Sequence, residues 1–115
     1  MIVHLAEKFS PFLGGRYRDD GPWSGQEFRE DFLIPWLREA MSGREALVVV
    51  LDGVAGVPSS FLEEAFGGLF RTTDWSASEL NSALKLRADD PDLWPYLSLA
   101  ARFMKEAAGR RERAN

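Results

Sequence analysis

Two adjacent serines, Ser59 and Ser60, are the residues of this chain whose positions most suggest chemistry. They follow a continuous apolar run and a short loop, and the apolar spacing from Phe61 onward indicates that a helix begins here. The first turn of a helix has free N–H groups and the positive end of the helix dipole, so a phosphate on either serine would be favoured. The simpler interpretation is that Ser60 caps the helix in a capping box with Glu63, because serine is a preferred N-cap.

The loop from Gly14 to Gly25 is a second candidate site. Arg16 and Arg18 lie beside Gly14 and Gly15, and arginines next to glycines can form a cradle for phosphate groups. The loop lacks the spacing and the Lys-Ser/Thr ending of a P-loop, and charged residues in turns are mostly solvated. A domain that binds a small ligand or a nucleotide through this loop is therefore the alternative function.

The residue types that metal sites and most hydrolases require are scarce. The chain has no cysteine, and His4 is its only histidine, so a metal site lacks ligands and a serine nucleophile has a single histidine as its base. Adjacent carboxylates such as Glu63 and Glu64 point in different directions on a helix and do not form a shared site by themselves. We therefore expect no enzyme, no metal and no cofactor.

The charge of the chain bears on its partners, because its formal net charge is −4. Nucleic-acid-binding proteins usually carry a basic surface, and a helix that crosses a membrane needs about 18 consecutive apolar residues, which the chain does not contain. The one basic cluster, residues 110–115, is expected to be a solvated tail after a single domain at 1–109. We predict a cytoplasmic protein that binds neither nucleic acid nor a membrane.

Three apolar segments are predicted to be strands. Ile2–Phe9 carries apolar residues at alternate positions, and Leu84–Ala88 alternates apolar with charged residues, which indicates a half-buried strand nearer an edge. Ala46–Leu51 is continuously apolar, which is typical of a strand covered on both faces, and we expect it at the centre of the sheet. The loop after the first strand has room for one more short strand at Arg16–Arg18.

The first predicted helix begins at Ser24. Ser24 and Glu27 have the spacing of a capping box, and Trp23 and Phe28 have that of a hydrophobic staple. Apolar residues then recur every three or four positions, which indicates one broad buried face. Pro35 lies inside this helix, so we expect a kink there or two short helices in sequence.

Later helices are predicted from Ser60, as a single turn after a capping signature at Ser76, and after Pro91. Gly67 and Gly68 would weaken an isolated helix, so we expect them where the helix backbone lies close against the sheet. Strands separated by helices indicate an α/β fold with mostly parallel neighbours.

Several short motifs of the chain resemble a known family. A strand, a Gly-Val pair and two serines at a helix start resemble the STAS domain of anti-sigma factor antagonists. The chain is more similar to the bacterial STAS-like family of unknown function, whose Ser-Phe-x-x-Glu signature matches residues 60–64. Gly14-Gly15-Arg16 and residues 24–29 look like the earlier motifs of that family, and the resemblance covers roughly Ile2 to Arg71.

This resemblance implies a mixed, partly parallel sheet of four or five strands with about three to four helices, largely on one side. It also implies that a protein partner binds near Ser59. In antagonist STAS domains a serine in an Asp-Ser-Ser-Gly motif is phosphorylated by an anti-sigma kinase, and that position matches Ser59. Pro58 stands where the motif has Asp, and Phe61 where it has Gly.

The expected function is a non-enzymatic regulatory module that binds another protein. Its predicted partner surface consists of Ser59, Ser60, Phe61 and Glu64, with the two serines as candidates for phosphorylation. The resemblance implies a histidine-kinase-like ATPase as the partner. Exposure of Trp23 or Trp75 would also mark an interface, because tryptophan is enriched there.

Overall fold

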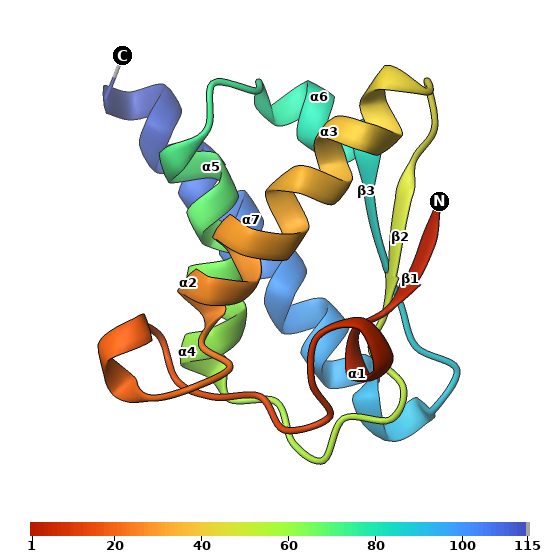
Figure 1. Cartoon of the computed structure of the whole chain (residues 1–115). Helices are drawn as coiled ribbons and strands as arrows, with labels where there is room; N and C mark the ends of the chain where they lie inside the picture. Colours follow the sequence, from red (N-terminus) through yellow and green to blue (C-terminus); the bar gives the residue numbers. More distant parts are fainter. Residues whose placement is uncertain (115) are drawn as a thin grey trace.

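The computed structural model, which describes residues 1–114, is built on a three-stranded parallel sheet (Figure 1). The strands are β1 (Ile2–His4), β2 (Leu47–Val50) and β3 (Leu84–Arg87), and β2 lies between the other two and runs parallel to both. The α/β class and the central position of the apolar run at 46–51 are confirmed. The expected mixed sheet of four or five strands is not found, because the described residues form three strands, all parallel.

The first strand is shorter than predicted. After β1 the chain turns into α1 (Leu5–Lys8), so the prediction of a strand over Ile2–Phe9 is wrong for its second half. Leu5 and Phe9 are both buried, and their spacing of four places them on the same side of one helical turn. The Phe9 N–H closes this turn by donating to the Leu5 carbonyl oxygen at 2.9 Å.

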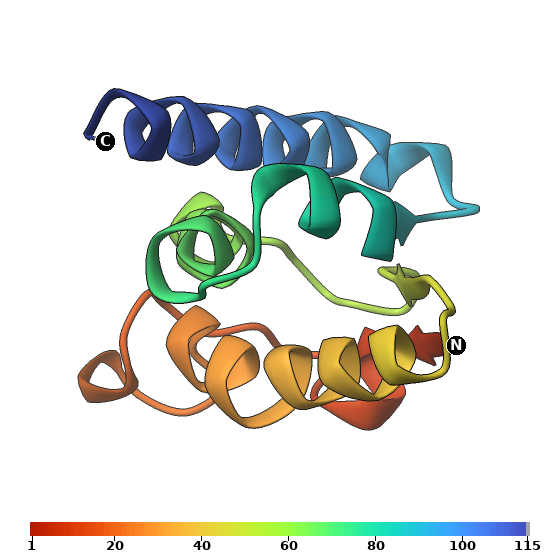
Figure 2. The ribbon, with the colours of Figure 1, turned by 90° about the horizontal axis from the view of Figure 1, so that it is seen from above.

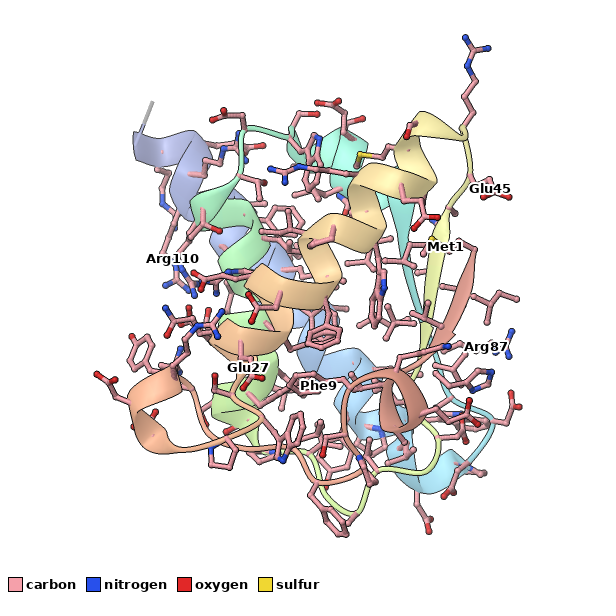
Figure 3. The ribbon with its side chains drawn as sticks, viewed as in Figure 1. Met1, Phe9, Glu27, Glu45, Arg87 and Arg110 are labelled. Atoms are coloured by element: carbon pink, nitrogen blue, oxygen red, sulfur yellow. The ribbon has the colours of Figure 1, made fainter. Side chains whose placement is uncertain are left out.

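One face of the sheet packs against helices and the other is open (Figure 2). The residues that point toward the helices are buried or half-buried: Val3, Leu47, Val49, Leu84 and Leu86. The exposed residues of the opposite face are Ile2, His4, Lys85 and Arg87. Figure 3 shows Arg87 pointing away from the helices. Of the two β2 residues on this face, Val48, paired with Ile2 in the register, is half-buried and Val50 is 1% exposed, so the predicted cover on both faces of β2 is confirmed in part.

The helix predicted after Ser24 is one continuous unit of three parts. It consists of α2 (Gly25–Phe28), the π-helical turn η2 (Arg29–Leu33) and α3 (Ile34–Ser42). Pro35 stands in the first turn of α3 and has no N–H to donate to the carbonyl four residues earlier. In place of the expected kink or pair of separate short helices, a π turn lies just before the proline within one continuous helical unit.

The start of α2 shows half of the predicted capping box. Ser24 Oγ accepts a hydrogen bond from the Glu27 N–H at 3.0 Å. The Glu27 carboxylate, however, accepts from the Trp23 N–H at 3.1 Å instead of from Ser24. The Trp23 ring, predicted to pack on Phe28, makes an edge-to-face contact with Phe9, with ring centroids 5.4 Å apart. Trp23 has a left-handed backbone with φ of 64°, which changes the direction of its side chain.

A second helical unit forms the centre of the core. It consists of α4 (Ser59–Leu62), the π-helical turn η3 (Glu63–Gly67) and α5 (Gly68–Thr72). The unit lies beside the sheet, between α2–α3 on one side and α7 (Trp94–Ala114) on the other (Figure 2). Nearly all of its residues from position 61 to position 70 are buried, as expected for a helix that is surrounded by protein.

The short helix α6 (Ala77–Ala83) precedes β3 and begins with the capping box predicted at Ser76. Both hydrogen bonds of the box are present at 3.0 Å, from the Glu79 N–H to Ser76 Oγ and from the Ser76 N–H to the Glu79 carboxylate. The backbone bond from Ser76 lowers the pKa of Glu79. The helix continues beyond the single turn that was predicted, because Leu80 and Ala83 are buried.

The last helix begins as its acidic start signal predicted. A 3₁₀ turn, η4 (Pro91–Leu93), precedes α7, and Asp90 caps it by accepting a hydrogen bond from the Asp92 N–H at 2.9 Å. In the described chain no helix, α7 included, combines the length and the apolar composition needed to cross a membrane.

The basic segment at the end of the chain continues α7. The helix runs past residue 109, where we expected the domain to end, and includes residues 110–114. Arg111 Nη1 donates to the backbone carbonyl oxygens of Phe70 and Trp75 at 3.3 and 2.7 Å. These contacts hold the turn at Arg111 against the end of α5, whereas Arg110 and Arg113 are exposed, so the predicted solvated tail is helical and docked in part; Asn115 lies outside the described residues.

Candidate functional site

The two serines lie at the start of α4, but neither caps it. The helix begins at Ser59, one residue earlier than predicted, and Pro58 occupies the N-cap position without a side-chain hydrogen bond. The capping box predicted between Ser60 and Glu63 is wrong, because the Glu63 carboxylate bonds to arginines instead. Ser59 is exposed and Ser60 is half-buried, so the Ser59 hydroxyl is accessible from solvent.

The other two residues of the predicted partner surface are buried. Phe61 has no exposed area; its ring is stacked on Phe28 with centroids 5.8 Å apart and lies 6.1 Å from the ring of Phe9. Glu64 is 7% exposed. The prediction that Phe61 and Glu64 present themselves to a partner is therefore not supported by their positions, because both lie beneath the surface that the serines form.

A buried ion pair joins the two π turns. Arg29, the first residue of η2, donates from Nη1 to the Glu64 carboxylate and to the Glu64 carbonyl oxygen, both at 2.6 Å. The two side chains are only 4% and 10% exposed. Charges buried to this extent need partners and hydrogen bonds, which each supplies to the other. π turns are rare and frequently occur at functional sites, and here two of them hold one pair.

Because Gly68 has no side chain, the Arg29 guanidinium can lie close against its backbone. A Cβ atom at Gly68 would lie 2.2 Å from Arg29 Nη1, and one at Gly67 would lie 2.6 Å from the carboxylate of Glu63. The expectation that this glycine pair lies against the sheet is therefore wrong. The glycines instead admit charged side chains from neighbouring helical turns.

Arg16 and Arg71 extend the buried pair into a network. Arg16 Nη1 donates to the Glu63 carboxylate at 2.6 Å and reaches Glu64 at 3.4 Å. Arg71 donates to both carboxylate oxygens of Glu63, at 2.5 and 3.0 Å. The hydrogen bond to Glu63 also raises the pKa of Arg16. The network ties the loop that contains Arg16 to the helix that begins at Ser59.

The loop from Gly14 to Gly25 is drawn together by backbone hydrogen bonds. The Gly14 N–H donates to the Trp23 carbonyl oxygen at 2.8 Å, and the Gly25 N–H donates to the Gly15 carbonyl oxygen at 2.9 Å. A Cβ atom at Gly14 would lie 2.2 Å from the Pro22 carbonyl oxygen, so this close approach requires glycine. The glycines thus serve the shape of the loop itself.

Arg18 is paired in the same way as Arg16. It starts the 3₁₀ turn η1 (Arg18–Asp20), where an additional short strand was expected. Its guanidinium donates to Asp31 at 2.9 Å and to Glu30 at 3.1 Å, and these bonds raise its pKa. Both arginines of the predicted phosphate cradle therefore face carboxylates of the chain in this structure.

Exposed aromatic side chains lie within this loop and just before it, and Trp23 is the one that was expected to mark an interface. Phe12, Tyr17 and Trp23 are 68%, 51% and 39% exposed. The Ala55 N–H donates to the Pro11 carbonyl oxygen at 2.8 Å, which joins this loop to the loop before α4. Figure 1 shows both loops at the end of the molecule where α4 begins. We call the exposed aromatic side chains of this region, with the exposed Ser59 and the half-buried Ser60, the serine–aromatic surface: Phe12, Tyr17, Trp23, Ser59 and Ser60.

Asp52 orders the neighbouring loops at the carboxyl ends of β2 and β3. Its carboxylate accepts hydrogen bonds from the N–H groups of Asp89 and Asp90, both at 2.9 Å, and these bonds lower its pKa. Among residues 1–114, no three His, Asp or Glu side chains are grouped as the ligands of a metal ion would be. The carboxylates described above are instead bound by arginines and by backbone N–H groups.

The Glu63 carboxylate leads to a prediction about pH. Hydrogen bonds from Arg71, and then from Arg16, hold the pKa of Glu63 below its ordinary value of 4.5, against the opposing effect of partial burial. A carboxyl group with a lowered folded-state pKa stabilises the fold above its unfolded-state pKa, and this contribution is lost as the pH falls through the folded-state value. We expect Glu63→Gln to be less stable than the wild type at neutral pH and to lose less stability on acidification.

Urea denaturation midpoints, measured from neutral pH down to the region of acid unfolding, test this prediction. The exposed Glu39 provides a control, since Glu39→Gln should give a curve parallel to that of the wild type. A Glu63→Gln curve that also runs parallel to the wild-type curve would contradict the role assigned to this carboxylate.

The comparisons with known proteins place the helical part of this region in one family, and the aromatic loop before residue 24 lies outside the match. A family model described as a STAS-like domain of unknown function matches residues 24–94, from the N-cap of α2 to the first residue of α7. The matched segment contains the serines and the Arg29–Glu64 pair, whereas Arg16 lies before it. No curated protein and no solved structure matches the chain.

Proposed function

The chain belongs to the family of STAS-like domains of unknown function, and we propose that it is a non-enzymatic regulatory module that binds a protein partner through its serine–aromatic surface. The observation that carries this proposal is the exposure of Phe12, which is 68% exposed beside the loop that leads to Ser59. A phenylalanine that remains in water on folding forgoes the gain of burial, and aromatic side chains are enriched at the centres of interfaces.

The rigidity of the surface supports the same proposal. Arg16 ties the aromatic loop to Glu63 at 2.6 Å, and the Ala55–Pro11 hydrogen bond ties it to the loop before α4. A surface that is ordered before binding loses less conformational entropy on association. The exposed aromatic residues are thus held in place beside the serines, which favours recognition of a folded partner.

The carboxylates with shifted pKa values also favour a binding role over a catalytic one. The pKa values of Asp52, Glu63 and Glu79 are all lowered by hydrogen bonds that hold the fold together. A general acid or base works best with a pKa near the operating pH, and these groups are shifted in the opposite direction.

The partner that we propose is a histidine-kinase-like ATPase, as the resemblance to antagonist STAS domains implies. Ser59 is the accessible serine at the position that such kinases phosphorylate in those domains. A phosphate there would add about 1.5 to 2 negative charges to this surface. Phosphorylation of Ser59 would therefore change the affinity for the partner and act as a switch.

Substitution of Phe12 tests the surface. We expect Phe12→Ser to weaken binding to the partner ATPase by more than about tenfold, because truncation of a hot-spot aromatic anchor costs about 2 kcal/mol or more and about 1.4 kcal/mol is a factor of ten. Ile2→Ser is the matched control, since Ile2 is 57% exposed on the open face of the sheet. Titration calorimetry with purified histidine-kinase-like ATPases of the same organism measures both variants. Equal affinities of Phe12→Ser and Ile2→Ser would show that the surface is wrongly assigned.

The same preparation tests the switch. Incubation with the ATPase and ATP, followed by mass spectrometry, should place a phosphate on Ser59, and Ser59→Asp should differ from Ser59→Ala in affinity. If the ATPase binds without modifying Ser59, the proposal of a protein-binding module is kept and the proposal of a phosphorylation switch is rejected. If none of the ATPases binds, the proposed class of partner is wrong.

A further inference from the structure

A cleft of about 540 Å³ lies between α5 and the last turns of α7. Its charged walls are three arginines and one aspartate: Arg71, Arg110, Arg111 and Asp74. Thr73 and the apolar residues Phe70 and Ala107 complete its lining. The cleft has the volume of an ordinary small-molecule site, which ranges from about 300 to 1,000 Å³. Its surplus of cations stands out in a chain whose net charge is −4.

We propose that this cleft binds a small phosphate ester of about the size of a nucleotide. The guanidinium group presents a planar fork of N–H donors that matches two oxygens of a phosphate. Two such groups, on Arg110 and Arg111, come from successive positions of α7 and line the same cleft. Asp74 and Thr73 provide an acceptor and a hydroxyl for the hydroxyl or amino groups of the rest of the ligand.

The contacts of Arg111 fix its guanidinium in the wall of the cleft. Its Nη1 atom donates to the Phe70 and Trp75 carbonyl oxygens at 3.3 and 2.7 Å. Within the hydrogen bonds of residues 1–114, Arg111 uses Nη1 alone, so its other N–H donors can bind a ligand. A donor that is already held in position loses less entropy when the ligand binds.

Arg110 contributes a charge that the fold leaves almost unused. Its side chain is 59% exposed, and the nearest carboxylate oxygen, on Glu106, is 3.7 Å away, beyond hydrogen-bonding distance. Figure 3 shows Arg110 projecting at the side of the molecule where α5 and α7 lie together. This arrangement differs from that of Arg71, whose donors are taken by Glu63. In the proposed site Arg71 therefore contributes its positive charge and part of the cleft lining, whereas Arg110 and Arg111 make the hydrogen bonds to the ligand.

The cleft and the serine–aromatic surface have no residue in common, so the proposed ligand site does not depend on the proposed protein partner. It also differs from the loop at Gly14–Gly25, whose arginines are paired with carboxylates. Cations in the last turn of a helix are favoured by the helix dipole, and this alone would place arginines at the end of α7. The helix dipole does not explain why two of these arginines line the same cleft.

The test is a titration of the full chain with inorganic phosphate, pyrophosphate and ADP. Binding is measured by NMR chemical shifts and by calorimetry. We expect ADP to bind more tightly than inorganic phosphate and to shift resonances of α5 and the end of α7. Arg110→Gln should weaken ADP binding by about tenfold, the size of one lost charge-assisted hydrogen bond, and leave the fold intact because Arg110 is exposed. Arg111→Gln should weaken it at least as much.

The control is Arg102→Gln, because Arg102 is an exposed arginine of α7 outside the cleft. Equal weakening by Arg102→Gln and Arg110→Gln would mean that the anion is attracted by the charge of the whole helix, which overturns the proposal. Absence of binding by all three anions at millimolar concentrations, or ADP binding unchanged in Arg110→Gln, would overturn it too. If Arg111→Gln fails to fold, the affinity of Arg110→Gln for ADP alone tests the proposal.

Discussion

Replacement of Glu64 by leucine is expected to lower the free energy of unfolding by about 3 to 5 kcal/mol, the cost of removing one partner of a buried ion pair. Arg29 would remain charged with its side chain 4% exposed, and its Nη1 atom would keep the Glu64 carbonyl oxygen but lose the carboxylate. Urea denaturation at neutral pH, followed by tryptophan fluorescence, measures the loss. Glu64→Gln should cost less, because the amide oxygen can still accept a hydrogen bond.

The double variant Arg29→Met, Glu64→Leu separates the charge from the packing. Replacement of a whole buried pair by apolar residues of similar volume is often neutral, so the double variant should regain most of the stability that Glu64→Leu loses. Gly68→Ala should act in the same direction as Glu64→Leu, since its Cβ atom would lie 2.2 Å from Arg29 Nη1. A loss of less than about 1 kcal/mol in Glu64→Leu, the size of an exposed ion pair, would mean that the charges are not buried as described.

The parts of the fold that local sequence determines were predictable. The apolar run at 46–51 is central in the sheet, and residues 84–87 of the alternating segment form an edge strand. The capping box at Ser76 is present because both of its partners lie within four residues of each other. The second half of Ile2–Phe9 was misassigned because Leu5 and Phe9 fit a helical turn as well as they fit the strand pattern, and tertiary packing decided between them.

The charged network was not predictable from local patterns. Arg16 and Glu63 are 47 positions apart, and Arg29 and Glu64 are 35 positions apart, so nothing in a short window connects them. The glycine pair before Leu69 did indicate a close approach. Which group approaches a glycine depends on how the helices pack, however, and the sequence alone favoured the sheet over a buried arginine.

The candidate site shows the same limit. The motif placed Ser59 correctly at a helix start, because a helix signal and a loop signal adjoin there. It also placed Phe61 on the partner surface, whereas the apolar spacing of that helix already suited a core position. Phe12 was overlooked, although an aromatic residue between Pro11 and Gly14 belongs to no periodic apolar face and is a candidate for exposure.

Phe61→Ala is the second substitution with a large expected effect. Phe61 is fully buried between Phe28 and Phe9, so loss of its ring should lower the free energy of unfolding by about 3 to 5 kcal/mol. Phe9 in turn contacts Trp23, with ring centroids 5.4 Å apart, so a cavity at Phe61 should also loosen the serine–aromatic surface from beneath. Phe61→Leu keeps most of the volume and should cost less than about 1.5 kcal/mol.

Phe66→Ala distinguishes support of the surface from loss of stability in general. Phe66 is also fully buried in the same helical unit and contacts Phe28, with ring centroids 6.1 Å apart, but it is not paired with Phe9 or Trp23. Both alanine variants should lose similar stability in denaturation, whereas Phe61→Ala should weaken partner binding more at a temperature where both remain folded. If Phe61→Ala instead weakens binding strongly with its stability unchanged, Phe61 contacts the partner directly, and the burial that separates it from the serines does not hold in solution.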